Sequence, residues 1–78
     1  MELGKQIKKY RSEKALSQDA LAEKIYVSRQ TISNWENDKS YPDVNSLVLL
    51  SKVFNVSLDQ LIEGDVEKMT EQINNSAD

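Results

Sequence analysis

The sequence predicts an all-α fold, a compact domain of five short helices, and three features of its pattern support this fold class. Apolar residues recur at intervals of three and four positions in several segments, as on the buried face of a helix. Ser or Asp stands directly before four of these segments, where either residue favours the start of a helix. No stretch alternates strictly between apolar and polar residues, so we expect no β-strand.

The N-terminal half is expected to hold three helices. The first covers residues 2–13, the second residues 17–25 and the third residues 28–37. Ser17 and Ser28 are the expected N-caps of the second and third helices. Helical spacing predicts that the buried face of the three helices consists of Leu3, Ile7, Tyr10, Leu21, Ala22, Ile25, Ile32 and Trp35.

The joint between the second and third helices is the most informative part of the pattern. It is too short for a relaxed hairpin, and so short a joint makes two helices cross steeply, at about 90–120°. A close crossing needs a small side chain at the contact, and Ala22 supplies one, while Val27 and Ile32 fill the angle. The segment is therefore expected to form a helix-turn-helix rather than two unrelated helices.

A loop containing Pro42 separates these helices from two more. The fourth helix is expected from its N-cap Asp43 to Phe54, followed by Asn55 in a left-handed conformation. The fifth begins after Ser57 and is closed by Gly64. Its apolar positions and those of the fourth helix are Leu47, Leu50, Val53, Phe54, Leu58, Leu61 and Ile62.

The expected domain covers residues 1–64, and residues 65–78 form an acidic tail. Val66, Met69 and Ile73 are spaced as on a short sixth helix. Such a helix would contribute to dimerisation or lead into a further region, while a frayed terminus explains the pattern equally well.

Composition restricts the function classes. The sequence contains no Cys and no His, which removes thiolate metal sites and the usual nucleophile–base pairs, and it shows no glycine-rich phosphate loop. We therefore expect no enzyme, no metal and no cofactor. The longest apolar run is far shorter than the roughly 20 residues of a membrane-spanning helix.

The net charge of −3 conceals an uneven distribution. Residues 1–42 contain eight basic and six acidic residues, a net charge of +2, whereas residues 43–78 contain two and seven, a net charge of −5. Because electrostatic contacts are screened beyond about 8–10 Å, the position of the charges matters more than their total. An anionic partner would have to meet the N-terminal half.

The residues LSQDALAEKI at positions 16–25 and VSRQTISNWEN at 27–37, with VSLDQLI at 56–62, resemble a known family. It is the lambda-repressor-like, Cro-type family of transcriptional regulators, also called the xenobiotic-response-element family. The resemblance covers about residues 3–64. It implies a five-helix domain whose third helix lies in the major groove of double-stranded DNA.

The resemblance also implies roles for single residues. Arg29, Gln30, Ser33 and Asn34 match base-reading positions, of which Ser33 and Asn34 read bases or phosphate. Gln18, Ser28, Asn37 and Lys39 match positions that contact phosphate, and Gln18 alternatively braces the first base-reading residue. Arg11 and Glu36 match a partly buried ion pair that fixes the pitch of the third helix, and this pair is favoured over the alternative of two ordinary surface charges.

Side-chain chemistry agrees with these roles. Arg can bond guanine O6 and N7 together, and Gln can bond adenine N6 and N7. Gln30 and Asn34 lie on the face opposite Ile32 and Trp35, which we expect to be core residues rather than a stacking platform. The alternative is that the polar residues merely solvate an exposed face. The lysines of the first helix likewise either steer DNA or are only solvated: Lys5, Lys8 and Lys9.

Tyr26 departs from the family pattern, in which Gly or Asn often ends the second helix. A left-handed backbone there costs a non-glycine residue about 1–2 kcal/mol. The joint is therefore either strained, or its geometry differs slightly and Tyr26 gains packing in return.

The expected function is sequence-specific DNA binding by a transcriptional regulator, a repressor that occupies a two-fold operator as a homodimer. The expected location is the cytoplasm, in association with the nucleoid. One rival is a protein-interaction adaptor that reuses the fold, for example an antitoxin-like partner of another protein. The other rival, an enzyme, is disfavoured by the composition.

Overall fold

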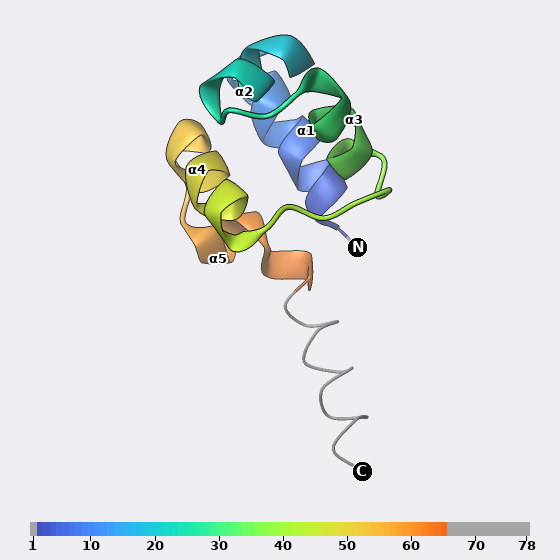
Figure 1. Ribbon diagram of the computed structural model, residues 1–78. Coiled ribbons are helices and arrows are strands. Elements are labelled where there is room, and N and C mark those ends of the chain that lie inside the picture. Colours follow the sequence, from blue (N-terminus) through green and yellow to red (C-terminus); the bar gives the residue numbers. More distant parts are fainter. Residues whose placement is uncertain (1, 66–78) are drawn as a thin grey trace.

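The computed structural model describes residues 2–65, in which five labelled helices are followed by a helical turn at residues 63–65 (Figure 1). These residues form no β-strand, which confirms the all-α fold class. The expected sixth helix and most of the acidic tail, from Val66 onward, lie outside the described residues. In chain order the helices are α1 (Leu3–Glu13), α2 (Gln18–Lys24), α3 (Arg29–Glu36), α4 (Val44–Phe54) and α5 (Leu58–Leu61).

Four of the five helices begin at the N-cap residue that the sequence predicts. The side-chain oxygens of Ser17, Ser28, Asp43 and Ser57 each accept a hydrogen bond from the backbone N–H three residues further on. Ser57 and Gln60 bond each other reciprocally and form a capping box. The starts of α2 to α5 are therefore encoded locally.

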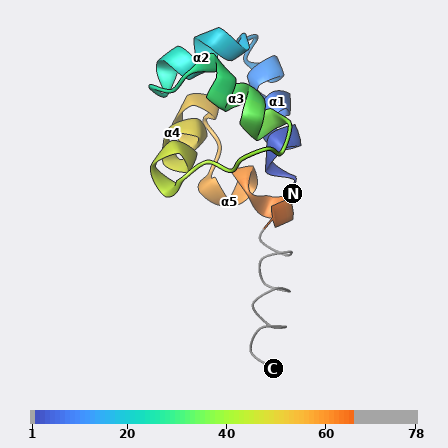
Figure 2. The same ribbon diagram turned by 45° about the vertical axis from the view of Figure 1, so that its right-hand side comes forward.

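Helix α1 is the centre of the packing and contacts α3, α4 and α5, while α2 packs on α3 (Figures 1 and 2). The predicted core positions of α1, α2 and α3 are buried, except that Tyr10 is half-buried, with its ring centroid 5.6 Å from that of Phe54. Val53 is half-buried and Leu58 lies at the surface. The core consists of Leu3, Ile7, Leu21, Ala22, Ile25, Ile32, Trp35, Leu47, Leu50, Phe54 and Leu61.

The end of α5 differs from the prediction. Helix α5 ends at Leu61, with Ile62 as its C-cap, and Gly64 does not have a positive φ. Gly64 serves a different purpose, because a Cβ at this position would lie 2.8 Å from the Glu2 side chain. The chain can approach the start of α1 only because this residue has no side chain. By contrast, Asn55 ends α4 in the predicted left-handed conformation, with φ of 55°.

Asp65, which the sequence predicts to lie in the acidic tail, is completely buried. Its carboxylate accepts hydrogen bonds from the backbone N–H groups of Glu2 and Leu3. The packed unit thus includes Asp65. No helix within residues 2–65 is long and apolar enough to cross a membrane.

Candidate nucleic-acid interface

The joint between α2 and α3 has the predicted helix-turn-helix form (Figure 2). Ile25 is the C-cap of α2 and Ser28 is the N-cap of α3. The backbone N–H of Val27 donates to the carbonyl of Ala22 at 3.0 Å, which closes the end of α2. Ala22 is buried, and α2 contacts α3, as expected if this small residue allows the two helices to approach closely.

Tyr26 decides between the two interpretations of this joint. Its φ of 63° is left-handed, and 87% of its surface is exposed. The side chain therefore gains no packing that would offset the backbone strain, which is about 1–2 kcal/mol for a residue with a Cβ. The joint is strained at Tyr26.

Helix α3 has one buried face and one polar face. Ile32 is completely buried and Trp35 is 5% exposed, so Trp35 is a core residue, as predicted. Of the four predicted base-reading residues, Arg29 and Gln30 are exposed in the first turn, whereas Ser33 and Asn34 are half-buried one turn later. The four side chains lie on the part of α3 that the core leaves uncovered: Arg29, Gln30, Ser33 and Asn34.

Two of these residues are bonded to each other. The amide Nε2 of Gln30 donates to Oδ1 of Asn34 at 3.0 Å. Among residues 2–65, the guanidinium of Arg29 has no hydrogen-bond or ion-pair partner. In the first turn of α3, the guanidinium of Arg29 therefore has all its donors available. The side-chain amide of Gln30 beside it is held by Asn34, one turn further on.

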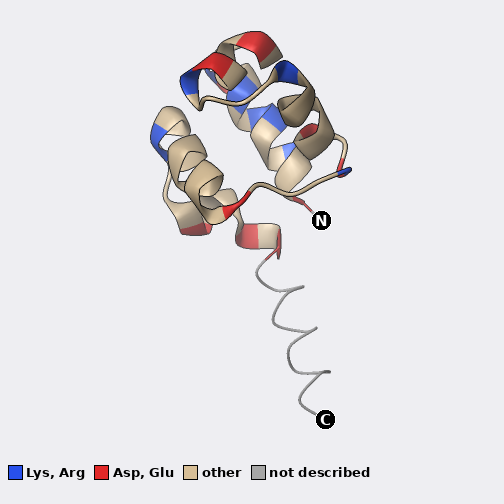
Figure 3. Cartoon of the chain, in the orientation of Figure 1, with Lys and Arg blue, Asp and Glu red and all other residues tan. Residues whose placement is uncertain are grey.

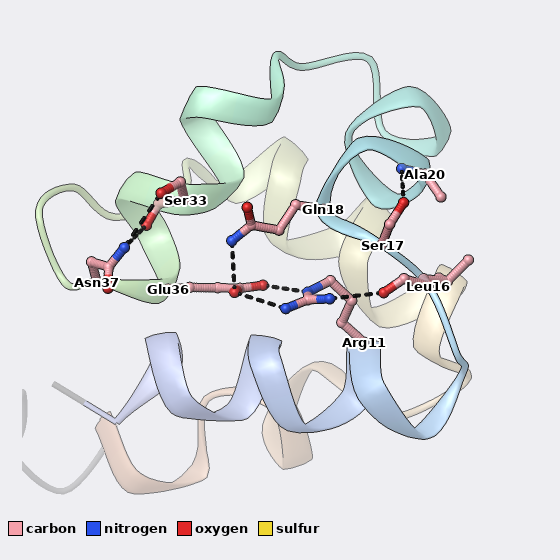
Figure 4. Close-up of polar contacts among 8 residues, drawn as sticks. All are labelled: Arg11, Leu16, Ser17, Gln18, Ala20, Ser33, Glu36 and Asn37. Atoms are coloured by element: carbon pink, nitrogen blue, oxygen red, sulfur yellow. Dashed lines mark hydrogen bonds and ion pairs between the residues drawn. The ribbon is translucent and has the colours of Figure 1, made fainter.

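The C-terminal end of α3 is closed by residues predicted to contact phosphate. Nδ2 of Asn37 donates to the carbonyl of Ser33 at 2.8 Å and to its hydroxyl at 3.3 Å (Figure 4). The backbone N–H of Lys39 donates to the carbonyl of Asn34 at 2.8 Å, and the Lys39 side chain is exposed. Asn37 is therefore partly engaged within the helix end, while the ammonium of Lys39 is open to a partner.

Ser28 is committed to the start of α3. Its hydroxyl accepts from the backbone N–H of Thr31 at 3.1 Å and shares a 2.9 Å hydrogen bond with the Thr31 hydroxyl. A phosphate near this helix start would therefore meet a hydroxyl that already has two partners.

Arg11 and Glu36 form a bidentate ion pair between α1 and α3 (Figure 4). Nε of Arg11 lies 2.7 Å from Oε2 of Glu36, and Nη2 lies 3.1 Å from Oε1. The two side chains are only 15% and 4% exposed. The remaining nitrogen, Nη1, donates to the carbonyl of Leu16 at 2.8 Å. Two charges with this little exposure are not ordinary surface charges.

Gln18 joins the same network, which the sequence did not predict. Its Nε2 donates to Oε1 of Glu36 at 3.1 Å (Figure 4). The first residue of α2 is thereby attached to the last residue of α3, and through Arg11 to α1. Helix spacing alone cannot show this bond, because it depends on how the two helices meet in space.

A second feature that the sequence did not predict is the role of Gly4. A Cβ on Gly4 would lie 2.6 Å from the Trp35 carbonyl oxygen and 3.0 Å from that of Glu36. The first turn of α1 therefore packs directly on the last turn of α3. A glycine within a helix is the available signal for such a close approach.

Helix α3 itself carries one exposed positive charge. Its two charged residues are Arg29, which is exposed, and Glu36, whose charge is neutralised by Arg11. Figure 3 shows basic positions along α1, and acidic positions on α2 and in the C-terminal part of the described residues. Lys5, Lys8 and Lys9 are exposed, and Nζ of Lys9 lies 5.2 Å from the centre of the Tyr10 ring. No group of acidic side chains within residues 2–65 could hold a metal ion.

Comparison with known proteins agrees with this geometry. Residues 7–61 match the family described as Helix-turn-helix. The chain belongs to the helix-turn-helix family. Over 65 residues, 83% of the chain, it is 45% identical to the HTH-type transcriptional activator BcrR of Enterococcus faecalis. The chain spans about a third of that relative, since the matched part is 32% of its length.

Solved structures of similar helix-turn-helix domains include two complexes with DNA. The c2 repressor of Salmonella phage P22, solved with a synthetic operator, is 34% identical, with a TM-score of 0.72 over 76% of this chain and 89% of the repressor chain. The regulator SinR, solved in complex with DNA, is 36% identical, with a TM-score of 0.72 over 77% of this chain and 97% of the SinR chain. These similarities place the chain among the DNA-binding domains of transcriptional regulators, which are not enzymes.

Proposed function

We propose that this domain binds double-stranded DNA sequence-specifically, with α3 in the major groove. The observation that carries the proposal is the polar outer face of α3, whose opposite face is buried and whose C-terminal end is fixed to α1 and α2 through Glu36. A rigidly held helix with Arg and Gln exposed in its first turn is what direct base reading in the major groove requires.

The side chains divide into base-reading and phosphate-contacting groups. Arg29, with its donors available, is suited to guanine, and Gln30 is suited to adenine. Ser33 and Asn34 read bases or phosphate one turn further on. Lys39 supplies a charge for the DNA backbone beyond α3. The remaining phosphate contacts come from the ends of the two helices: Gln18, Ser28 and Asn37.

Gln18 is able to serve two partners at once. One hydrogen of its Nε2 is bonded to Glu36, and an amide nitrogen carries two hydrogens. The second hydrogen can donate to a phosphate while the first keeps the side chain in place. This favours phosphate contact by a braced Gln18 over direct bracing of Arg29.

Selection from a randomised duplex library tests the base-reading assignment. We expect a defined site to be enriched by the wild-type domain, and Arg29→Ala and Gln30→Ala each to relax the preference at one position. Each lost contact should reduce discrimination by about 1–3 kcal/mol. Lys52→Ala is the matched control, because it removes an exposed positive charge from α4. If Arg29→Ala and Lys52→Ala select the same site as wild type, Arg29 does not read bases.

We further propose that the domain acts as a homodimer on a two-fold operator and represses by occupying it. One short recognition helix reads few base pairs, so two half-sites about 34–36 Å apart give the required selectivity. The operator complex of the P22 c2 repressor supports repression, whereas BcrR is named an activator. The protein would then act in the cytoplasm, at the nucleoid.

Two measurements test this second proposal. Sedimentation with operator DNA is expected to give two chains per duplex, and a saturated complex of one chain per duplex would refute the dimer. A reporter gene placed behind the selected operator is expected to be silenced by wild type and released by Arg29→Ala. Increased reporter expression with wild type would instead identify an activator.

A further inference from the structure

Asp65 is a buried charged residue that the proposed DNA contacts do not use. It is completely buried and is the last of the residues that the structure describes. Its Oδ2 accepts from the backbone N–H of Leu3 at 3.0 Å, and its Oδ1 accepts from that of Glu2. A buried carboxylate is stable only when hydrogen-bonded, so these contacts account for its presence in the packed unit.

The two N–H groups belong to the start of α1, where the chain provides no local cap. The N-cap residue Glu2 makes no side-chain capping bond, unlike the N-caps of α2 to α5. Asp65 supplies both the acceptor oxygens and the negative charge that the positive end of α1 favours. The cap of α1 thus comes from the opposite end of the domain.

The same carboxylate contacts the segment that follows the recognition helix. The Tyr41 hydroxyl donates to Oδ2 of Asp65 at 3.4 Å. Burial and the neighbouring Asp65 charge raise the pKa of Tyr41 above its ordinary value of 10.0, so the hydroxyl remains a donor at neutral pH. Tyr41 lies two residues after Lys39, within the connection from α3 to α4.

The first turn of α1 also contacts the end of α3 directly. Gly4, the residue after Leu3, leaves no space for a Cβ against the carbonyls of Trp35 and Glu36. A shift of the α1 start therefore displaces the last turn of α3. Asp65 is therefore connected to the region around Asn37 and Lys39 through two sets of contacts. One is its hydrogen bond with Tyr41, and the other is the packing of the α1 start, at Gly4, against the end of α3.

We infer that Asp65 is a positioning residue for DNA binding, which fixes the end of α3 and the following connection by holding the α1 start and Tyr41 together. This inference rests on the proposed function, since it explains how Asn37 and Lys39 are held in position to contact phosphate. In this role Asp65 acts through α3 and the following connection rather than by a contact of its own with DNA.

The test uses the full 78-residue chain with the variants Asp65→Ala and Tyr41→Phe. Glu63→Ala is the matched control, because it removes an exposed carboxylate from the same segment. The first readout is the NMR amide spectrum without DNA. We expect Asp65→Ala to shift the amides of Glu2, Leu3 and residues 36–41, Tyr41→Phe to shift mainly residues 38–42, and Glu63→Ala to shift neither group.

The second readout is the salt dependence of DNA affinity, measured where all variants are folded. A lost phosphate contact makes the log–log slope shallower by about 1, whereas a smaller folded fraction lowers affinity equally at every salt concentration. We expect the shallower slope for Asp65→Ala and the wild-type slope for Glu63→Ala. If Asp65→Ala leaves both the amides of residues 36–41 and the slope unchanged, Asp65 is only a helix cap and the inference is wrong.

The two readouts separate failure of this inference from failure of the proposed function. If no variant or wild type binds any duplex, the proposed function fails, while the amide shifts of residues 36–41 still decide whether Asp65 fixes that region. If Arg29→Ala abolishes selective binding and Asp65→Ala behaves as Glu63→Ala does in both readouts, the function stands and the positioning role is excluded.

Discussion

Single residues hold the helix-turn-helix together through contacts that combine charge with burial. Glu36 is the clearest case, because one carboxylate receives the guanidinium of Arg11 and the amide of Gln18. The sequence suggests the Arg11–Glu36 pair through resemblance, but it gives no sign that Gln18 shares it. Its position follows from the way the start of α2 meets the end of α3, which is a property of the assembled helices.

Arg11→Ala is expected to destabilise the domain well beyond the 0–1 kcal/mol of an exposed ion pair. Removing the guanidinium leaves Glu36, whose side chain is 4% exposed, without its cation. The loss should approach the roughly 3–5 kcal/mol seen when one partner of a buried pair is removed. Thermal or urea unfolding measures it, with Lys8→Ala as the exposed control on the same helix. An unchanged midpoint for Arg11→Ala would falsify the structural role of the pair.

Tyr26→Gly is expected to stabilise the domain modestly and to preserve DNA binding. The left-handed strain at Tyr26 is about 1–2 kcal/mol, and the extra freedom of glycine in the unfolded chain offsets roughly 0.5–1 kcal/mol of the gain. Tyr26→Ala is the control, because it removes the same exposed ring and keeps the strain. Urea unfolding should therefore rank Tyr26→Gly above Tyr26→Ala. Equal stability of the two variants would show that the positive φ carries no strain.

At the scale of elements, sequence predicts helix starts better than helix contacts. The N-caps of α2 to α5 are local patterns of a few residues, and all four are found in place. The cap of α1 lies 62 residues away from Leu3, at Asp65, so no local pattern contains it. Gly64 was misassigned for the same reason, since it allows a close approach to Glu2 rather than ending α5.

Gly4→Ala is expected to destabilise the packing of α1 on α3 despite the better helix propensity of alanine. The new Cβ would lie 2.6 Å from the Trp35 carbonyl oxygen, an atom of the backbone that cannot rotate away. Overpacking of this kind typically costs about 1–3 kcal/mol, more than the roughly 0.5–1 kcal/mol that alanine gains over glycine within a helix. Urea unfolding gives the sign of the balance. The exposed substitution Ser12→Ala, also in α1, should change stability little, and a stabilised Gly4→Ala would contradict the close packing.

The start of α4 is expected to weaken in acid through Asp43. The backbone N–H of Ser46 donates to this carboxylate and lowers its pKa below the ordinary value of 3.8. Because the pKa of Asp43 is lower in the folded state than in the unfolded state, the ionised cap stabilises the fold fully at any pH above the unfolded-state pKa. This contribution is lost as the pH falls through the folded-state pKa. Unfolding curves of wild type and Asp43→Ala should therefore differ at neutral pH and converge below pH 3.8. A difference that persists unchanged as the pH falls well below that value would exclude the charged cap.

At the scale of the whole molecule, the acidic overall charge and the DNA-binding geometry coexist because the charges are separated. The net charge of −3 would disfavour an anionic partner if it were spread evenly. Helix α3 instead presents Arg29, while Glu36 is neutralised by Arg11. The charge division along the chain predicts this arrangement, and the helix-turn-helix pattern predicts the fold. Neither pattern predicts the contacts of Asp65 with Glu2 and Leu3, because these residues come together only when the whole domain is folded.

The proposed dimer leads to a prediction about the operator itself. Two recognition helices on one DNA face require half-sites separated by about 10–10.5 base pairs. Inserting five base pairs between the half-sites turns one of them to the opposite face, so we expect affinity to fall to that of a single half-site. Inserting ten base pairs returns the two half-sites to the same face of the DNA but doubles the distance between them. A dimer of fixed span should still fail to bind both half-sites. Titration of the three duplexes measures this. Equal affinity for all three would mean that each domain binds alone, and the two-fold operator would then have to be abandoned.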